Sequence, residues 1–166
     1  MAVTDQDSTQ VTTLESTGNV QKLDAAAYQG TCVDLPFDFT QGAAAGDATS
    51  TVDLCILPPG DYLFLGPRSW VVFSAFGAAR TLDIGWRAYT APDGTAVAVS
   101  AGGINAAIDV SAAGILSGLG GALANSTGRK KLFSSKTGVK LFATVNVSTI
   151  PAAATLSGSI SIMRAG

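Results

Sequence analysis

The chain has 166 residues and a mass of 16.7 kDa, which fits one domain rather than two. Charged residues make up only 13% of it, against about 25% in a typical soluble domain. Histidine is absent, which removes the commonest general base and the commonest metal ligand. The composition therefore argues against a hydrolase, a metalloenzyme or an acid–base catalyst, and we expect no enzyme activity, no metal and no cofactor.

The net charge of -2 hides an uneven distribution. Residues 1–61 hold nine acidic residues and one basic residue, whereas residues 62–166 hold three acidic and nine basic ones. Such halves either arise by chance or attract each other within a chain or across subunits. Arg129–Lys131 is the one local basic cluster, typical of a solvated turn. Nucleic-acid binding needs a dense basic stripe with stacking aromatics, so we expect no nucleic-acid partner.

A membrane span is not expected either. The most apolar stretch, residues 111–127, is interrupted by glycines and is shorter than the roughly 20 apolar residues of a spanning helix. The first residues, Met1–Asp7, are acidic and polar, without the basic and apolar regions of a secretory signal.

In chain order, a polar segment comes first and strand-like runs follow. Residues 1–20 are rich in Thr, Ser, Gln and Asp, so we expect residues 1–24 to form an extended arm and residues 25–166 a single domain. Beyond them, short apolar or alternating runs are separated by Gly/Pro turns. The runs that predict strands are residues 31–35 (ending before Pro36), 51–57, 62–65, 69–74, 81–89, 139–147 and 156–163.

Residues 94–128 are ambiguous. Ile104, Ile108 and Ala112 recur at four-residue spacing, which is compatible with a short helix over residues 104–113. The glycines that follow are typical of an irregular loop. Short strands with almost no helical periodicity predict an all-β fold. We expect an antiparallel, jelly-roll-like β-sandwich with an N-terminal arm and one long loop excursion that has room for a short helix.

The two cysteines, Cys32 and Cys55, fall in expected strands. A free cysteine in a strand behaves as a small buried hydrophobe. A disulfide is the alternative if the two strands are neighbours, although thiols of a cytoplasmically made chain usually stay reduced.

Motifs for catalysis are weak. Residues 98–102 (AVSAG) match the nucleophile elbow only in part, because alanine replaces its first glycine and no histidine can activate Ser100. Asp34 and Asp38 are close in sequence, but two aspartates in a loop are more often solvated or capping than catalytic.

Trp70 and Trp86 are the largest side chains. Either they pack in the core, or they are exposed at a subunit or ligand contact, where tryptophan is enriched. Arg68 and Arg87 lie close to them in sequence and have the chemistry to stack on these rings or pair with acids of a neighbour.

The central segment resembles a known family. Residues 57–60 (LPPG) are followed by Val71-Val72 and then by residues 75–86 (AFGAARTLDIGW). This order is similar to that in small head proteins of tailed bacteriophages, in which such a turn precedes a strand and a small-residue turn leads into a strand ending in glycine and an aromatic. The resemblance covers residues 50–90 well and the last 30 residues loosely.

The proteins it resembles are head decoration, or cement, proteins, which are β-sandwich modules on the assembled capsid. The resemblance implies a non-catalytic virion protein, made in the host cytoplasm, that binds the major capsid protein on the outer capsid surface and stabilises the capsid. It also implies self-association as a homotrimer. The candidate subunit or capsid contacts are Asp5, Asp7, Val11, Leu14, Arg68, Trp70, Arg87, Arg129, Lys130 and Lys131.

Two alternative functions stay open at this point. A tail or head–tail connector component would assemble into rings or tubes. A surface- or glycan-binding β-sandwich module would present Trp70 and Trp86 as an aromatic platform.

Overall fold

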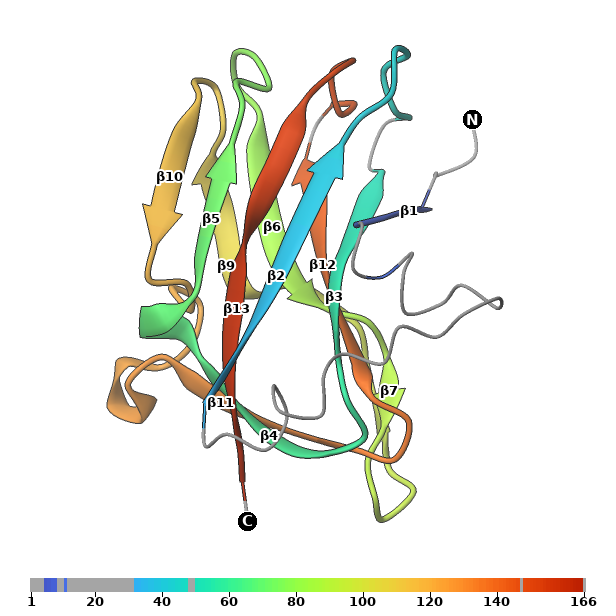
Figure 1. Ribbon diagram of the computed structural model, residues 1–166, viewed down its shortest axis with the longest axis vertical. Coiled ribbons are helices and arrows are strands. Elements are labelled where there is room, and N and C mark those ends of the chain that lie inside the picture. The colour runs from blue at the N-terminus through green and yellow to red at the C-terminus, as the bar shows by residue number, and fades with distance from the viewer. Residues whose placement is uncertain (1–4, 9–10, 12–31, 48–49, 147, 166) are drawn as a thin grey trace.

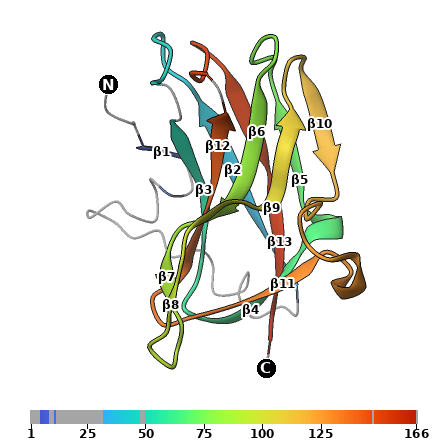
Figure 2. The same ribbon diagram turned by 180° about the vertical axis from the view of Figure 1, so that it is seen from behind.

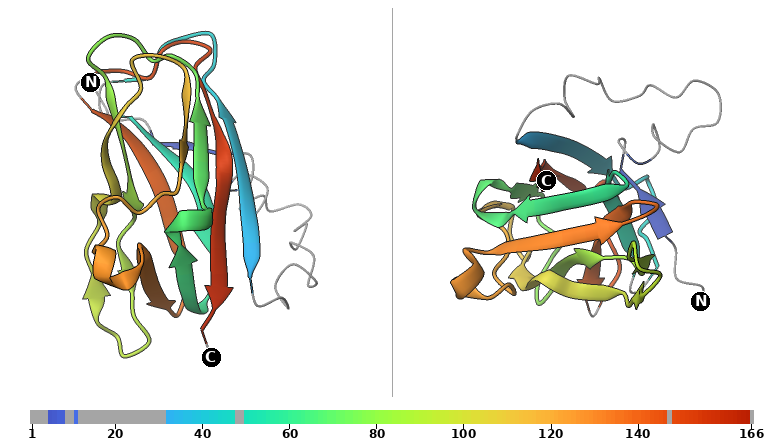
Figure 3. Two further views of the ribbon diagram at one scale, coloured as in Figure 1. Left: turned by 90° about the vertical axis from the view of Figure 1, so that its left-hand side faces the viewer. Right: turned by 90° about the horizontal axis from the view of Figure 1, so that it is seen from below.

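The computed structural model describes residues 5–8, 11, 32–47, 50–146 and 148–165, and its strands form two sheets that pack face to face (Figures 1 and 3). The five-stranded sheet has the order β1 (Asp5–Asp7), β3 (Thr51–Leu57), β12 (Val139–Asn146), β6 (Thr81–Trp86), β9 (Ser100–Asp109). The six-stranded sheet has the order β10 (Gly114–Ser117), β5 (Trp70–Phe73), β13 (Thr155–Arg164), β4 (Gly60–Leu65), β11 (Lys130–Ser135), with β2 (Val33–Thr40) also paired to β13. The predicted jelly-roll-like β-sandwich is confirmed.

Smaller elements connect the sheets. β7 (Tyr89–Thr90) and β8 (Ala96–Val97) form a hairpin that extends beyond one end of the sandwich (Figure 2). Two short 3-10 turns, η1 (Gly66–Arg68) and η2 (Asn125–Thr127), lie beside each other in the views of Figures 1 and 2. Among the described residues, no helix is both long and apolar enough to cross a membrane.

The core lies between the sheets because apolar residues alternate along most strands. In β2, Val33, Leu35, Phe37 and Phe39 are buried while the residues between them are exposed. This strand was expected to end before Pro36, yet it continues to Thr40. Its described pairing is with β13 alone, so it lies at a sheet edge, where the missing N–H of a proline breaks no ladder bond.

The short helix considered over residues 104–113 is wrong, because this stretch belongs largely to strand β9. Its register against β6 slips between Leu82 and Ile84, and Ala107 has φ +54°. A spacing of four residues is also two repeats of the two-residue alternation of a strand, so the spacing of Ile104 and Ile108 does not distinguish a helix from a strand. The expected turn at residues 129–131 is also corrected, since β11 begins at Lys130.

A buried serine forms the corner between β4 and β5. Both strands pair with the same edge of β13, β5 at Leu156–Ser159 and β4 at Ile162–Arg164. Between them, fully buried Ser69 donates from Oγ to the carbonyl of Leu65 (2.9 Å) and accepts from the backbone N–H of Ser161 (2.9 Å). One hydroxyl therefore ties the corner to the central strand.

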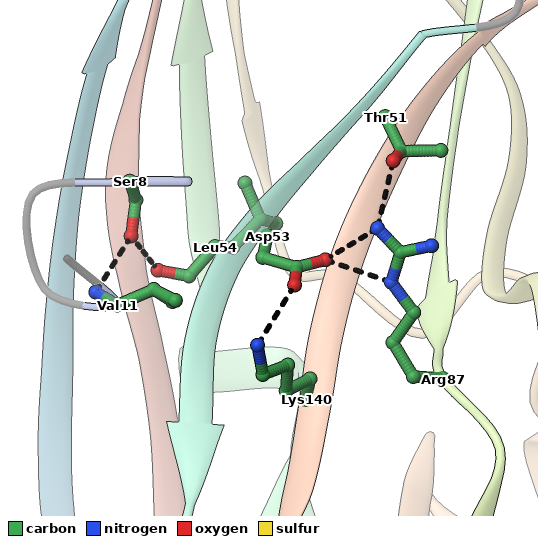
Figure 4. A network of polar contacts seen from close by, with 7 residues as sticks. All are labelled: Ser8, Val11, Thr51, Asp53, Leu54, Arg87 and Lys140. Carbon is green, nitrogen blue, oxygen red and sulfur yellow. Dashed lines mark hydrogen bonds and ion pairs between the residues drawn. The ribbon is translucent and has the colours of Figure 1, made fainter. Parts of the chain in front are cut away.

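A buried carboxylate secures the five-stranded sheet (Figure 4). Asp53 Oδ1 accepts from Arg87 Nε (2.8 Å) and lies 2.7 Å from Arg87 Nη2, and Lys140 Nζ is 3.4 Å from Asp53 Oδ2. Arg87 Nη2 also donates to Thr51 Oγ1 (2.7 Å), and its guanidinium lies 4.4 Å from the ring centroid of Phe142. These contacts join β3, β12 and the chain that leaves β6.

The first described residues belong to this sheet. β1 pairs in parallel with β3, and the backbone N–H of Ser8 donates to the carbonyl of Asp53 (2.7 Å). The Ser8 hydroxyl donates to the carbonyl of Leu54, and Val11 is fully buried. Part of the segment expected to be an arm therefore extends the chain's own sheet.

Both cysteines are free thiols. Cys55 is buried on β3, and desolvation, with the charge of Asp53 as a smaller cause, raises the pKa of its thiol well above the usual value. Cys32 is partly exposed.

Replacing Ser69 with alanine should lower the free energy of unfolding by about 1–3 kcal/mol, because the buried N–H of Ser161 loses its acceptor. Urea unfolding followed by circular dichroism measures this. Ser126→Ala, at an exposed position in η2, is the matched control and should leave the midpoint unchanged; equal midpoints for both variants would contradict the assigned role.

Replacing Asp53 with asparagine should destabilise the protein by about 2–4 kcal/mol, because two partly buried cations lose their carboxylate. The same unfolding assay measures it. Asp93→Asn makes the same chemical change on the exposed hairpin and retains the oxygen that accepts from the N–H of Thr95, so it should cost far less.

Cys55 should resist a thiol reagent such as 5,5′-dithiobis(2-nitrobenzoate) in the folded protein, because only the thiolate reacts and burial suppresses it. Cys32→Ser isolates this thiol. We expect no fast release of thionitrobenzoate until denaturant is added. Rapid stoichiometric reaction of the folded Cys32→Ser variant would show that the site opens.

Candidate assembly surface

The strands β10, β5, β13 and β2 lie side by side in one sheet (Figure 1), whose outer face carries the candidate contact Trp70, close in sequence to Arg68 in the turn η1. The reason is strand alternation in β5, where Val71 and Phe73 are buried in the core and Trp70 and Val72 are exposed. The same alternation holds in β2. This face is therefore built from the side chains that the core does not use.

An apolar patch, defined here as Trp70, Val72 and Ile115, lies on β5 and β10. Their exposed fractions are 38%, 37% and 63%. Ile115 is directly opposite Val72 in the β5–β10 ladder, so the two side chains are neighbours on one face. Trp70 follows on the same face two residues away. Clustered exposed apolar groups of this kind mark contact sites, and tryptophan dominates binding hot spots.

A row of serines separates this patch from β2. Ser157 pairs with Val72 on one side and with Asp38 on the other. Ser159 pairs in the same way with Trp70 and Pro36. Each row of the face therefore runs from an apolar side chain through a small hydroxyl to β2.

An acidic edge, defined here as Asp34 and Asp38, lies on β2 on either side of Pro36. All three are exposed. The hydroxyl of Ser161 donates to Asp34 Oδ1 and lies 3.3 Å from the carbonyl of Arg68. Arg68 and Asp34 thus flank the same residue of β13 from opposite sides.

A basic corner, defined here as Arg68, Arg129 and Lys130, lies where the turn η1 meets the start of β11. The carbonyl of Arg129 accepts from the N–H of Gly66 (3.1 Å), and Arg129 Nη1 donates to the carbonyl of Gly118 (3.4 Å). A Cβ at Gly66 would lie 2.3 Å from the carbonyl oxygen of Leu119. Only glycine lets these backbones approach so closely.

A second apolar strip crosses the lower part of this sheet. Leu132 is 53% exposed and pairs with Leu63, which pairs in turn with Met163. The core-facing Phe133 next to Leu132 is buried, so the strip points away from the core.

Two basic candidates lie elsewhere. Arg87 is held by Asp53 on the five-stranded sheet. Lys131 Nζ lies 4.4 Å from the ring centroid of Trp86 and 5.3 Å from that of Phe133, and burial lowers the pKa of its ammonium. The structure therefore brings together Arg68, Trp70, Arg129 and Lys130, but neither Arg87 nor Lys131.

Trp86 is a packing residue. Its ring meets Phe133 edge to face (centroids 5.6 Å apart), and its indole N–H donates to the carbonyl of Ala98 (3.2 Å). Trp70 is on the outer face of the other sheet. The two tryptophans consequently do not form the single aromatic platform that a glycan-binding module would present.

The N-terminal candidates have mixed positions. Asp5 is in β1, opposite Thr51. Asp7 is exposed and Val11 is fully buried, while Leu14 lies outside the described residues. Contact between this segment and a neighbouring subunit stays a prediction.

The chemistry of the described residues offers little for catalysis. Within the described ranges, no three His, Cys, Asp or Glu side chains are grouped as metal ligands. Ser100 begins strand β9 opposite Trp86, which is not the strand–turn–helix context of a nucleophile elbow.

Sequence reasoning missed Val72, Ile115 and Leu132 as surface residues. The alternation of residues 70–73 contained the signal for Val72. Ile115 was hidden because β10 is only 4 residues long and lies between glycines. For Leu132, the neighbouring basic residues suggested a turn.

Comparisons with known proteins show the fold. No family model matches the chain, and no curated protein matches it. A chain of the solved "Capsid of Ralstonia phage GP4" superposes with a TM-score of 0.61 at 18% identity, covering 98% of this chain and 99% of that one. A chain of the "Cyanophage Pam1 capsid asymmetric unit" gives a TM-score of 0.43 at 14% identity, covering 81% and 82%. Over nearly its whole length, this chain has the fold of a chain in the GP4 capsid structure.

Proposed function

We propose that this chain is a non-catalytic virion protein that binds the outer surface of a phage capsid and stabilises it, as decoration or cement proteins do. The observation that carries the proposal is the end-to-end fold likeness to a chain of the GP4 phage capsid structure, which covers 98% of this chain and 99% of that one. Coverage of both chains means that the whole module, rather than a common fragment, is shared.

The surface chemistry supports this proposal. The apolar patch and the basic corner combine tryptophan and arginine, the residue types that contribute most to binding at protein interfaces. On a repeating capsid lattice, weak individual contacts add up when several copies bind at once. The partner we propose is the major capsid protein, and the homotrimer implied by the sequence resemblance stays a prediction.

Purified protein added to capsids of its own virus that were assembled without it should bind saturably at fixed lattice positions on the outer surface. Electron cryomicroscopy of the mixture measures occupancy and position. Bound protein should also raise the temperature at which the capsids lose their DNA, because a bridge between capsomers favours the intact shell.

Capsids of an unrelated phage provide the control and should stay bare. Absence of added density at saturating protein, or density confined to tails or connectors, would contradict a role in capsid decoration.

A further inference from the structure

We propose that two copies of this chain pair edge to edge through β11, in antiparallel orientation, about a two-fold axis at Leu132. The occupant of the edge is the same strand of a second copy, and the two six-stranded sheets become one. β11 crosses the lower end of the sandwich (Figure 1), and its described pairing is with β4 alone. This contact between copies does not depend on capsid binding, so the two proposals fail separately.

One backbone hydrogen bond shows which way the groups of β11 point. The N–H of Gly66 donates to the carbonyl of Arg129 (3.1 Å), so these residues form a hydrogen-bonded pair just before β11 begins. Such pairs alternate with non-hydrogen-bonded pairs along an antiparallel ladder, and the β11–β4 register has no shift. Every second residue of β11 therefore directs its N–H and carbonyl away from β4. These residues are Lys130, Leu132 and Ser134.

The ladder on the far side of β4 gives the same assignment. The N–H of Ala165 donates to the carbonyl of Asp61 (2.9 Å), which continues the β13–β4 register. Asp61 and Leu63 consequently bond toward β13. Their partners on β11, Ser134 and Leu132, cannot use the same groups, so their own N–H and carbonyl groups face the free edge.

The other described edge strands are less suited to pairing. β10 has 4 residues and β1 has 3. β2 carries Pro36, and β9 is bulged around Ala107. Short, proline-bearing and bulged edges resist strand addition. β11 has 6 residues, no proline and no bulge, and Leu132 at its centre is 53% exposed.

A two-fold axis at Leu132 pairs all the outward backbone groups of the strand. It places the two Leu132 residues opposite each other and sets each Lys130 opposite Ser134 of the other copy. Each of these three pairs exchanges two backbone hydrogen bonds, so none of the outward groups stays unpaired. The two leucine side chains meet as cross-strand neighbours, and the strip that each forms with Leu63 and Met163 becomes continuous across both copies.

The charges favour this register. Ser134 is opposite Asp61 on β4 and donates to Asp61 Oδ1, and Asp61 is exposed. Lys130 of the second copy lies one strand beyond Ser134, roughly 10 Å from Asp61 between Cα atoms, a gap that the two side chains span. An axis at Lys130 would instead oppose two lysines, which is destabilising. Lysine on an edge normally deters pairing, and here it selects the register.

The core-facing side of the strand is compatible with the same register. Between the hydrogen-bonded pairs, each Lys131 is opposite Phe133 of the other copy. Lys131 Nζ already lies 5.3 Å from the ring centroid of its own Phe133, and an ammonium group beside an aromatic ring is favourable. Six paired residues span only about 20 Å, so the interface is smaller than a standard one. We therefore expect a dissociation constant in the micromolar range.

Sedimentation equilibrium of the purified protein from about 10 µM to 1 mM tests the pairing. The wild type should show a monomer–dimer equilibrium. Leu132→Lys should weaken it by about tenfold or more, because like charges then meet across the axis. Ile115→Lys is the matched control, since it makes the same kind of change at an exposed position of another edge strand, β10. It should leave the equilibrium unchanged.

Proline substitution tests the direction of the backbone groups. Leu132→Pro removes an N–H that faces the free edge, so the variant should fold and fail to dimerise. Lys131→Pro removes an N–H that bonds to β4 and should lower the urea midpoint much more. Equal midpoints for the two variants would contradict the assignment of the free edge.

A mixing experiment tests the register. Lys130→Asp and Asp61→Lys should each weaken the dimer by about threefold to tenfold, because both copies of the contact then oppose like charges. An equimolar mixture should form heterodimers about as readily as the wild type forms homodimers, since each contact joins opposite charges again. A mixture that stays as weak as the single variants would contradict this register.

A wild type that stays monomeric to about 1 mM, or a dimer unaffected by Leu132→Lys, would overturn the pairing. Loss of capsid binding by Leu132→Lys in a protein that never self-associates would assign the edge to a capsid strand instead. Circular dichroism melts confirm that each variant is folded. Should Asp61→Lys fail to fold, Leu132→Lys and Lys130→Asp still decide between these outcomes.

Discussion

The outer face of the six-stranded sheet depends on one buried hydroxyl. Ser69 ties the turn between β4 and β5 to β13, and its immediate neighbours in sequence are Arg68 and Trp70. The corner makes β5 pair with the same edge of β13 as β4. Together with the β5–β13 ladder, this contact holds Trp70 beside Ser159 and the carbonyl of Arg68 beside Ser161. A core contact thus determines the geometry of a surface.

The two sheets use their outer faces differently. On the five-stranded sheet, the carboxylate of Asp53 is buried with Arg87 and Lys140, and the ring of Phe142 lies under the guanidinium. These charged side chains pair with one another and hold the strands of this sheet together. On the six-stranded sheet, the apolar patch and Arg68 are left exposed.

Much of the fold could be predicted from the sequence, because alternation reports which face of a strand is buried. The run at residues 51–57 became β3 with the expected bounds. The prediction failed at β9, where a bulge makes the ladder irregular. It also failed at Pro36, which does not end β2 because this strand lies at a sheet edge. The sequence could not predict that Trp70 and Trp86 lie on different sheets. Which sheet a strand joins depends on pairing between strands distant in sequence, and no local pattern of residues encodes that pairing.

The position of β13 has a consequence for the time at which this surface appears. β13 is the last of the described strands, and β2, β4 and β5 all pair with it. During synthesis, these three strands emerge before β13, with which they all pair. The six-stranded sheet therefore closes only after nearly the whole described chain has emerged. The face shared by β5, β13 and β2 therefore cannot form before β13 has been synthesised. Association through this face requires β13 to be in place.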